Sequence, residues 1–351
     1  MTERRIVIGA GGTAGHVVPA LAVADALRAE GAEVVFIGGE RAELELVPAA
    51  GYELHPLRVM SLPRGAPAKA AKAVAVDAGA VHAARRLIRR LRPVAALGAG
   101  GYVAGPVGLG AVLSRVPLTL MEADSHLGLT NRLLAPMARR VCLAFPIPGR
   151  DSSRYLVTGR PVPAPARDRT AARARFGIAP DETCVLVFGG SQGARSINQA
   201  AVEAFAGARF HVLHAAGERD LPDLQSPGPH YDLRGYIPHF GEALLASDLV
   251  IARSGGSVFE IAAHGRPAIL IPYPYATADH QTANARYMEQ AGAATIIPDS
   301  ELTAPRLAQE AGRLLADVGR LAAMARAAAA VARPDAAGLI AREVLSTARK
   351  R

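Results

Sequence analysis

Aromatic side chains are scarce in this chain of 351 residues, at 5 % of the sequence, and tryptophan is absent. Proteins that bind nucleic acids usually stack bases on aromatic side chains within a basic surface. The chain is basic, with a formal net charge of +9, but no motif combines basic with aromatic residues. The composition therefore favours a phosphate ligand or an anionic membrane surface, and it argues against nucleic acid as a partner.

Cysteine is also rare. Cys142 and Cys184 each lie in an apolar, strand-like run, which predicts buried, reduced thiols and a cytoplasmic protein. No signal peptide is expected, because the chain enters a strand-like run at once. The least charged stretch, residues 93–113, is long enough to span a bilayer, but it contains six glycines and two prolines. A strand, a loop and a helix are therefore expected there instead of a membrane span.

Short apolar, β-branched runs alternate with stretches rich in Ala, Leu and Arg along the whole chain. This alternation predicts strand–helix–strand units and therefore parallel sheets of an α/β protein. Helices are expected, for example, over residues 19–30 and 194–206. Strands are expected at 5–8, 33–37, 95–97, 118–121, 141–145, 185–188, 210–214, 249–252 and 268–271.

A proline-rich segment interrupts this pattern at residues 159–169, with prolines at 161, 163 and 165. Because proline is excluded from helix interiors and central strands, this segment is expected to be a linker. We predict two doubly wound domains, residues 1–158 and 159–334, and a last helix over 335–351 that can pack back on the first domain. Ligands of such sheets bind beyond the carboxyl ends of the strands, so the glycine-rich loops there are candidate sites opening into one cleft.

The first glycine-rich loop follows the first expected strand. Gly9, Gly11 and Ala14 match the G-x-G-x-x-G/A pattern of dinucleotide-binding proteins, and Glu40 stands where an acid that binds ribose is expected. This pattern alone allows an NAD-dependent oxidoreductase. However, that interpretation gives no role to a second glycine-rich loop, GGSQGA at 189–194.

The second loop is the stronger candidate for a phosphate site. Its glycines permit positive φ, and the main-chain N–H groups around Ser191 stand at a predicted helix N-terminus, which attracts anions. Downstream, SGGS at 254–257 leads into a short helix with Glu260 in its first turn, and DHQTANA at 279–285 adds amides and an acid. Glu260 can bind vicinal hydroxyls or simply cap the helix. Such groups suit a sugar better than a nicotinamide.

Taken together, these segments resemble the MurG family of peptidoglycan N-acetylglucosaminyltransferases, which are inverting GT-B glycosyltransferases. The resemblance implies two Rossmann-like domains facing across a cleft. It also implies transfer of GlcNAc from UDP-GlcNAc to the C4 hydroxyl of undecaprenyl-linked MurNAc-pentapeptide (lipid I), which forms lipid II at the cytoplasmic face of the membrane. The matching segments are GGTAGHVVPALAVADAL (11–27), GAGGYVAGP (98–106), GLTNRLLA (128–135), VTGRPV (157–162), FGGSQGARSIN (188–198), RSGGSVFEIAA (253–263) and DHQTANA (279–285).

The resemblance assigns roles to individual residues. The loop around Ser191 would meet the donor diphosphate, Ile237 would contact uracil through its main chain, and Glu260 would bind the ribose. The residues implied on the acceptor side are Gly12, Gly100, Gly101 and Tyr102. Those implied on the donor side are Thr13, Ala14, Gly15, Asp124, Arg160, Ser191, Gln192, Gly193, Ile237, Gly256, Ser257, Glu260 and Gln281.

Two positions depart from the family pattern. The family usually has an Asn where this chain has Asp124, and an anionic carboxylate cannot donate hydrogen bonds to a sugar. The family's Asn-Pro-Val-Arg is here Arg160-Pro-Val-Pro163, so Arg160 is expected to replace the missing guanidinium from three residues earlier. These departures keep open a related GT-B enzyme with another lipid or natural-product acceptor.

Inverting transfer needs a group that takes the proton of the attacking hydroxyl. His16, at the end of the first glycine-rich loop, is the expected base, and it can alternatively cap the helix. Glu122 is the second candidate, as base or as a residue that orients the acceptor. No Asp-x-Asp pair and no His/Cys spacing predicts a protein-held metal, so no cofactor is expected beyond a divalent cation that stimulates the reaction in solution.

A lipid-linked acceptor requires contact with the membrane. Residues 81–93 place Arg85, Arg86, Arg89, Arg90 and Arg92 on one broad face of a predicted helix, with Leu87, Ile88 and Leu91 opposite. This face is either simply solvated or attracted to anionic lipid, at about 1 kcal/mol per basic residue. Arg64, Lys69 and Lys72 are expected to extend the same patch.

Overall fold

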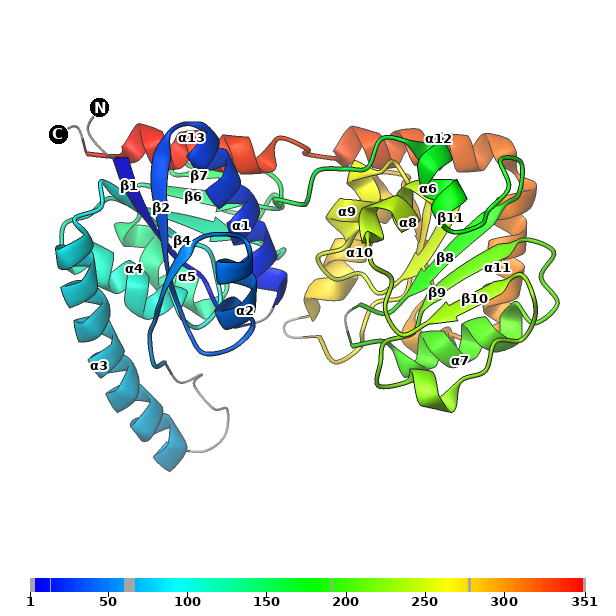
Figure 1. Ribbon diagram of the computed structural model, residues 1–351, viewed down its shortest axis with the longest axis horizontal. Coiled ribbons are helices and arrows are strands. Elements are labelled where there is room, and N and C mark those ends of the chain that lie inside the picture. Colours follow the sequence, from blue (N-terminus) through cyan, green and yellow to red (C-terminus); the bar gives the residue numbers. More distant parts are fainter. Residues whose placement is uncertain (1–3, 13, 60–66, 191, 277–278, 350–351) are drawn as a thin grey trace. The chain divides into compact units, whose positions relative to one another are not determined.

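The computed structural model describes residues 4–12, 14–59, 67–190, 192–276 and 279–349, with the side chains of residue 14 and residues 67–78 left out. The chain forms two compact units (Figure 1). Unit 1 comprises Met1–Pro163 and Arg333–Arg351, and unit 2 comprises Ala164–Ala332. The chain thus leaves unit 1 once and returns to it for its last nineteen residues.

Unit 1 is built on a seven-stranded parallel sheet in the order β3-β2-β1-β4-β5-β6-β7. Its inner strands are continuous apolar runs, as expected for strands covered on both faces. The strand order reverses between β1 and β4, so the loops that follow these two strands lie at a topological switch point. The strands are β1 (Arg4–Gly9), β2 (Ala32–Gly38), β3 (Glu53–Pro56), β4 (Ala95–Gly98), β5 (Leu118–Glu122), β6 (Arg140–Leu143) and β7 (Tyr155–Val157).

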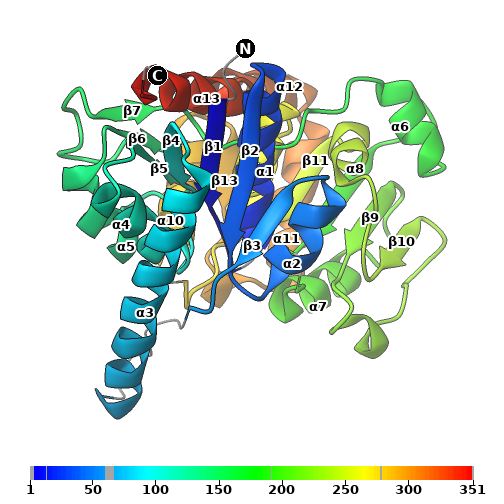
Figure 2. The ribbon, with the colours of Figure 1, turned by 60° about the vertical axis from the view of Figure 1, so that its left-hand side comes forward.

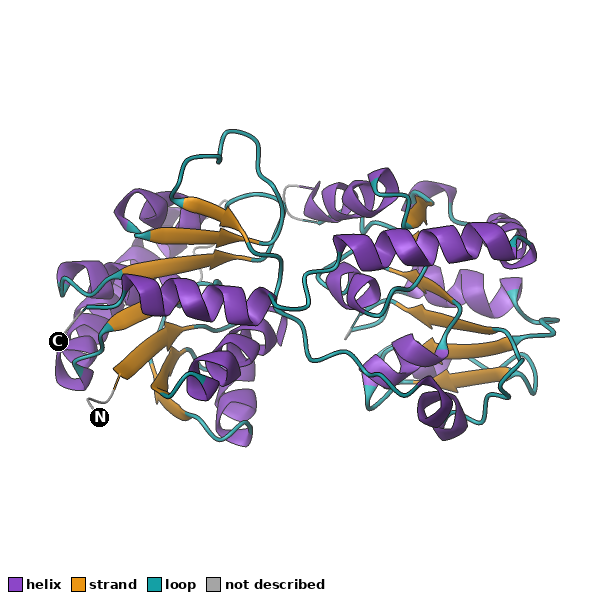
Figure 3. Cartoon of the chain, turned by 90° about the horizontal axis from the view of Figure 1, so that it is seen from above, coloured by secondary structure: helices purple, strands orange, loops and turns teal. Residues whose placement is uncertain are grey.

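Helices cover both faces of this sheet (Figure 3), and α3 extends well beyond its edge (Figure 2). On one face, α1 and the last helix α13 pack together, with Ile340 and Val344 fully buried against the sheet. On the other, Ile88 of α3 and Val107 of α4 lie in the core. The helical elements are α1 (Ala14–Ala29), α2 (Ala42–Ala49), α3 (Pro67–Leu91), α4 (Ala104–Leu113), α5 (Leu129–Leu134), η1 (Ala135–Met137) and α13 (Ala336–Thr347).

Unit 2 has a six-stranded parallel sheet in the order β10-β9-β8-β11-β12-β13, which reverses between β8 and β11. Val187, Ile251 and Ile269 lie on its core strands and are fully buried. The strands are β8 (Cys184–Phe188), β9 (His211–Ala215), β10 (Tyr231–Arg234), β11 (Leu249–Ala252), β12 (Ala268–Leu270) and β13 (Ala294–Ile296). The helical elements are α6 (Arg169–Arg175), α7 (Arg195–Ala204), η2 (Leu221–Asp223), α8 (Phe240–Ala246), α9 (Val258–Ala263), α10 (His280–Gln290), η4 (Asp299–Glu301), α11 (Ala304–Ala316) and α12 (Val318–Val331).

The two-sheet α/β architecture expected from the sequence is confirmed, and each of the nine expected strands overlaps an observed one. Both cysteines are buried and free, and burial raises the pKa of each thiol to about 12. Residues 93–113 form β4, a loop and α4. Among the described residues, no helix combines the length and apolar character needed to cross a bilayer.

Candidate functional site

The glycine-rich loop after β1 packs against the loop after β4, main chain against main chain. Gly100 and Gly101 have φ of +92° and +76°, and a Cβ atom on Gly101 would lie 1.9 Å from the carbonyl oxygen of Gly11. A Cβ atom on Gly100 would lie 2.8 Å from Cδ2 of His16. Only glycine fits these two positions, which lets the two loops touch and brings the His16 ring over Gly100.

A buried carboxylate holds the first of these loops. Glu43, in the first turn of α2, is fully buried, and its Oε2 accepts the N–H of Gly12 at 2.9 Å. The N–H of Gly12, a residue expected on the acceptor side, is therefore already satisfied within unit 1. Tyr102 lies beside Gly12, and burial together with the Glu43 carboxylate raises the pKa of its hydroxyl.

His16 lies in the first turn of α1 and is partly buried. Burial and the positive charge of Arg160 lower the pKa of the imidazole, and the carboxylate of Asp124 opposes this shift. Because the pKa is lowered from a value near neutrality, the ring is uncharged at pH 7. A neutral imidazole is the form that can accept a proton.

Glu122 ends β5 and is 6 % exposed. Its Oε1 accepts the N–H of Asp124 at 3.1 Å, while Oε2 accepts the N–H of Gly128 at 2.8 Å and Nδ2 of Asn131 at 3.0 Å. Burial nevertheless raises the pKa of this carboxyl. Since both oxygens hold the loop between β5 and α5, the geometry favours an organising role for Glu122.

Arg160 joins the segments that carry these groups. Its Nη2 donates to the carbonyl oxygen of Gly15 at 2.6 Å, and its Nη1 donates to that of Ala123 at 3.3 Å. The neighbours of these two carbonyls are His16 on one side and Asp124 on the other. Arg160, expected from the resemblance to bind the donor, thus ties the start of α1 to the loop after β5 within unit 1.

In unit 2, the glycine-rich loop after β8 leads into α7. Gly190 and Gly193 have φ of +94° and +73°, and a Cβ atom on Gly193 would lie 2.0 Å from the carbonyl oxygen of Ala216. Gln192 is exposed. Thr13 and Ser191 lie outside the described residues, as does the side chain of Ala14.

The loop after β11 lies at the same edge of this sheet. Ser254 donates through Oγ to the carbonyl oxygen of Gln281 at 2.7 Å, and Oε1 of Gln281 accepts the N–H of Tyr273 at 3.0 Å. The other side-chain atom, Nε2, stands beside Gly255. Gly256, Ser257 and Glu260 are partly exposed at the start of α9, whereas Ile237 is only 1 % exposed.

The structure adds two functional candidates that the sequence did not reveal. Glu43 was missed because an acid in the first turn of a short helix reads as an ordinary cap, and the dinucleotide pattern drew attention to Glu40 instead. Arg253 is 9 % exposed and joins three elements: it donates to Asp299 at 2.6 Å, to Ser196 at 2.9 Å and to the carbonyl oxygen of Ile271 at 3.2 Å. Only its position before SGGS could have signalled it.

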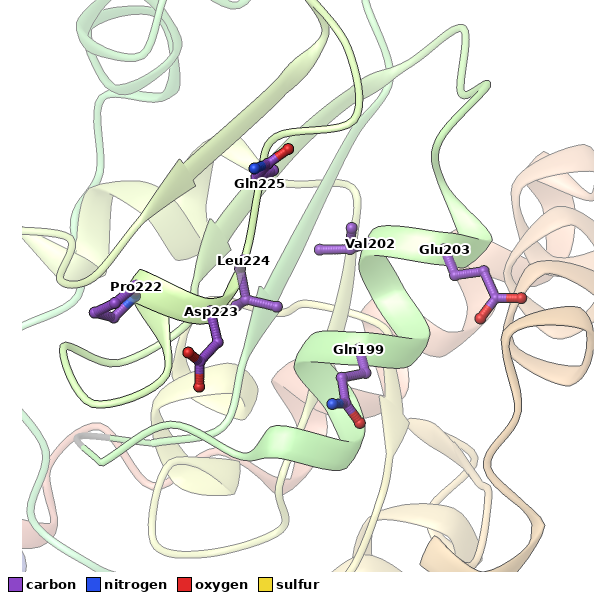
Figure 4. Close-up of a pocket in the computed structure, with 7 residues that line it drawn as sticks. All are labelled: Gln199, Val202, Glu203, Pro222, Asp223, Leu224 and Gln225. Atoms are coloured by element: carbon purple, nitrogen blue, oxygen red, sulfur yellow. The ribbon is translucent and has the colours of Figure 1, made fainter.

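Within the described part of the chain, no group of three His, Cys, Asp or Glu side chains could hold a metal ion. A surface hollow of about 440 Å³ lies between α7 and the η2 segment (Figure 4). None of the residues predicted for substrate binding lines it. The lining residues are Gln199, Val202, Glu203, Pro222, Asp223, Leu224 and Gln225.

Comparison with known proteins gives consistent matches over nearly the whole chain. Residues 6–143 match the glycosyltransferase family 28 N-terminal domain, and residues 184–340 match the glycosyltransferase family 28 C-terminal domain. Two relatives are named UDP-N-acetylglucosamine–N-acetylmuramyl-(pentapeptide) pyrophosphoryl-undecaprenol N-acetylglucosamine transferase. The protein of Rubrobacter xylanophilus is 41 % identical, and the match covers 93 % of this chain and 99 % of that protein. The protein of Salinibacter ruber is 40 % identical, and the match covers 98 % of this chain and 96 % of that protein. The crystal structure of Acinetobacter baumannii MurG is 29 % identical, with a TM-score of 0.78 over 98 % of this chain and 99 % of that one.

Proposed function

Since this chain belongs to glycosyltransferase family 28, we propose that it transfers GlcNAc from UDP-GlcNAc to the C4 hydroxyl of lipid I and so forms lipid II. The observation that carries this proposal is about 40 % identity, over 98 % of the chain, to a relative named for that reaction. Family membership also decides against the NAD-dependent oxidoreductase. The chain is a UDP-sugar-dependent hexosyltransferase with the GT-B fold.

The loop after β8 is suited to the leaving diphosphate. Gly190 and Gly193 bring the main chain to the start of α7, where the first N–H groups of a helix lack intrahelical partners. These amides and the helix dipole favour a diphosphate without any lysine. Glu260 in the first turn of α9 and Gln281 in the first turn of α10 are suited to hydroxyl groups of the donor.

The reaction is a single in-line displacement. The C4 oxygen of the acceptor forms a bond to the anomeric carbon of GlcNAc, and the bond from that carbon to the diphosphate oxygen breaks. UDP leaves with the electron pair, and the hydroxyl proton passes to neutral His16. The lowered pKa of His16 keeps it in the accepting form at pH 7. Glu122 holds the loop after β5, and Arg160 keeps that loop beside His16.

We further propose that unit 1 meets the cytoplasmic face of the membrane. Arg86, Arg89 and Arg90 are exposed on α3, while Ile88 turns into the core. Such a face attracts anionic lipid. Arg64 and the side chains of Lys69 and Lys72, expected in the same patch, lie outside the described residues. Co-sedimentation with anionic vesicles should be lost at high salt, whereas equal binding to neutral vesicles would contradict this proposal.

A radiolabel-transfer assay tests the activity itself. Purified protein with UDP-[¹⁴C]GlcNAc and lipid I in detergent should give labelled lipid II. Parallel reactions offer other undecaprenyl-linked sugars and soluble natural-product aglycones, because Asp124 departs from the family pattern. Transfer to one of these but not to lipid I would overturn the assignment of the acceptor, and the absence of any transfer would overturn the activity.

A further inference from the structure

A hydrogen-bond network of buried polar side chains lies next to the loop after β8. The Tyr231 hydroxyl lies 2.8 Å from Nδ1 of His214, and Nε2 of His214 lies 3.0 Å from Oδ1 of Asn198. Asn198 then donates through Nδ2 to the carbonyl oxygen of Ala216 at 2.9 Å and to Asp220 at 3.1 Å. His214 and Asn198 are fully buried.

The donor and the acceptor of each hydrogen bond in this network can be assigned. Nδ2 of Asn198 faces two acceptors, so its Oδ1 must accept, and Nε2 of His214 must carry the hydrogen. Nδ1 is then an acceptor, and the Tyr231 hydroxyl fills it. Burial lowers the pKa of His214 to about 4, so the ring stays neutral and the polarity stays fixed at physiological pH. Buried polar groups that satisfy one another in this way are rigid.

This hydrogen-bond network ends on the main-chain segment that supports the glycine-rich loop. The carbonyl oxygen of Ala216, which Asn198 holds, is the atom that a Cβ on Gly193 would meet at 2.0 Å. A Cβ on Gly217 would likewise lie 2.6 Å from the nitrogen of Gly193. The segment 216–217 therefore presses directly on Gly193, and any movement of it would shift the loop.

We propose that Asn198 is a positioning residue for the donor diphosphate: its amide ties the segment 216–217 to α7, and His214 fixes the orientation of that amide. Asn198 touches no substrate. It keeps the main chain around Gly193 in the arrangement that receives the diphosphate. This inference rests on the proposed function only in assuming that the loop after β8 binds the donor.

The isosteric variant Asn198→Asp tests the tether. A carboxylate at position 198 still accepts from His214 but cannot donate to the carbonyl oxygen of Ala216. It would also face the carboxylate of Asp220. The pKa of Asp220 is lowered by Arg219, by Arg195 and by the hydrogen bond from Asn198. We expect UDP-GlcNAc to bind about tenfold more weakly, with the KM for acceptor unchanged, because a buried acceptor loses its donor. Lowering the pH toward 5 should restore part of the affinity in this variant alone, because the two facing carboxyls then share a proton.

Two matched variants separate this effect from general damage to the core. Gln199→Glu also replaces an amide with a carboxylate, one residue further along α7, but on an exposed side chain. Tyr231→Phe removes the hydroxyl at the other end of the network and leaves the hydrogen bond from Asn198 to Ala216 in place. Both should bind UDP-GlcNAc within twofold of the wild type. Equal weakening by Tyr231→Phe and Asn198→Asp would overturn the proposal. If Asn198→Asp does not fold, Asn198→Ser removes the amide without adding charge and should weaken binding without recovery at low pH.

Hydrogen exchange without ligand gives a readout that does not depend on the proposed function. The amides of Gly193 and Gly217 should exchange faster in Asn198→Asp than in the wild type, while those of unit 1 stay unchanged. Unaltered exchange at these amides would overturn the tether. Failure of the wild type to bind UDP-GlcNAc would instead overturn the proposed function, and the exchange result would still decide the role of Asn198.

Discussion

Gly101→Ala should destabilise unit 1 through a single contact. The new Cβ would lie 1.9 Å from the carbonyl oxygen of Gly11, whereas ordinary Cβ contacts begin near 3.4 Å, so one main-chain segment must move by more than an ångström. Overpacking of this kind costs about 1–3 kcal/mol. The φ of +76° adds about 1–2 kcal/mol for a residue with a Cβ. The expected loss of unfolding free energy is therefore about 2–5 kcal/mol.

Gly51→Ala is the matched control for this substitution. Its φ of +73° is nearly the same, but a Cβ there meets nothing within 4 Å. Only the conformational part of the cost remains, about 1–2 kcal/mol. The difference between the two variants isolates the contact between the loops after β1 and β4.

Urea unfolding followed by circular dichroism measures both variants, and lipid II synthesis measures the consequence for activity. Gly101→Ala should also lower kcat/KM for the acceptor, because the movement displaces the loop that precedes His16. Gly51→Ala should leave kcat/KM unchanged. Equal losses of unfolding free energy, or full activity in Gly101→Ala, would refute the reasoning that these two loops depend on close main-chain contact.

Four further substitutions test the site. His16→Ala should lower kcat by about 10²–10⁴-fold with the Kd of UDP-GlcNAc unchanged, as measured by single turnover and calorimetry, and near-normal turnover would remove it as the base. Asp124→Asn should lower the pKa of His16, so the fall of kcat/KM on acidification should begin at lower pH. Arg160→Gln should raise the pKa of His16 and move that fall to higher pH. Shifts of the opposite sign would contradict the assignment of His16 as the base. Arg253→Ala should lower the free energy of unfolding, measured in urea, by about 3–5 kcal/mol, because Asp299 loses the buried guanidinium that it pairs with. A loss below about 1 kcal/mol would show that this ion pair does not stabilise the fold.

The strands missed by sequence reasoning share one property. β3, β7, β10 and β13 are the four edge strands of the two sheets. Inner strands are apolar on both faces and stand out in the sequence, whereas an edge strand such as β3 (Glu53–Pro56) is short, half-exposed and partly polar. Their pairing depends on the neighbouring strand, which local pattern cannot report.

The site was predictable to a similar extent. Glycine spacing located the loops after β1, β4, β8 and β11, because positive φ and close main-chain approach demand glycine. It could not locate the side chains that hold those loops. Glu43, Asn198 and Arg253 act through partners far away in the sequence, so that each looks ordinary until the fold brings its partner to it.

The return of the chain to unit 1 through α13 has a consequence for biosynthesis. Ile340, Ala341 and Val344 complete the core against α1, so unit 1 lacks part of its interior until α13 has been synthesised. Unit 2 is continuous in sequence, so its interior does not depend on these residues. Residues 4–163 therefore cannot complete their own domain before all of unit 2 has been synthesised, although they come first in the chain.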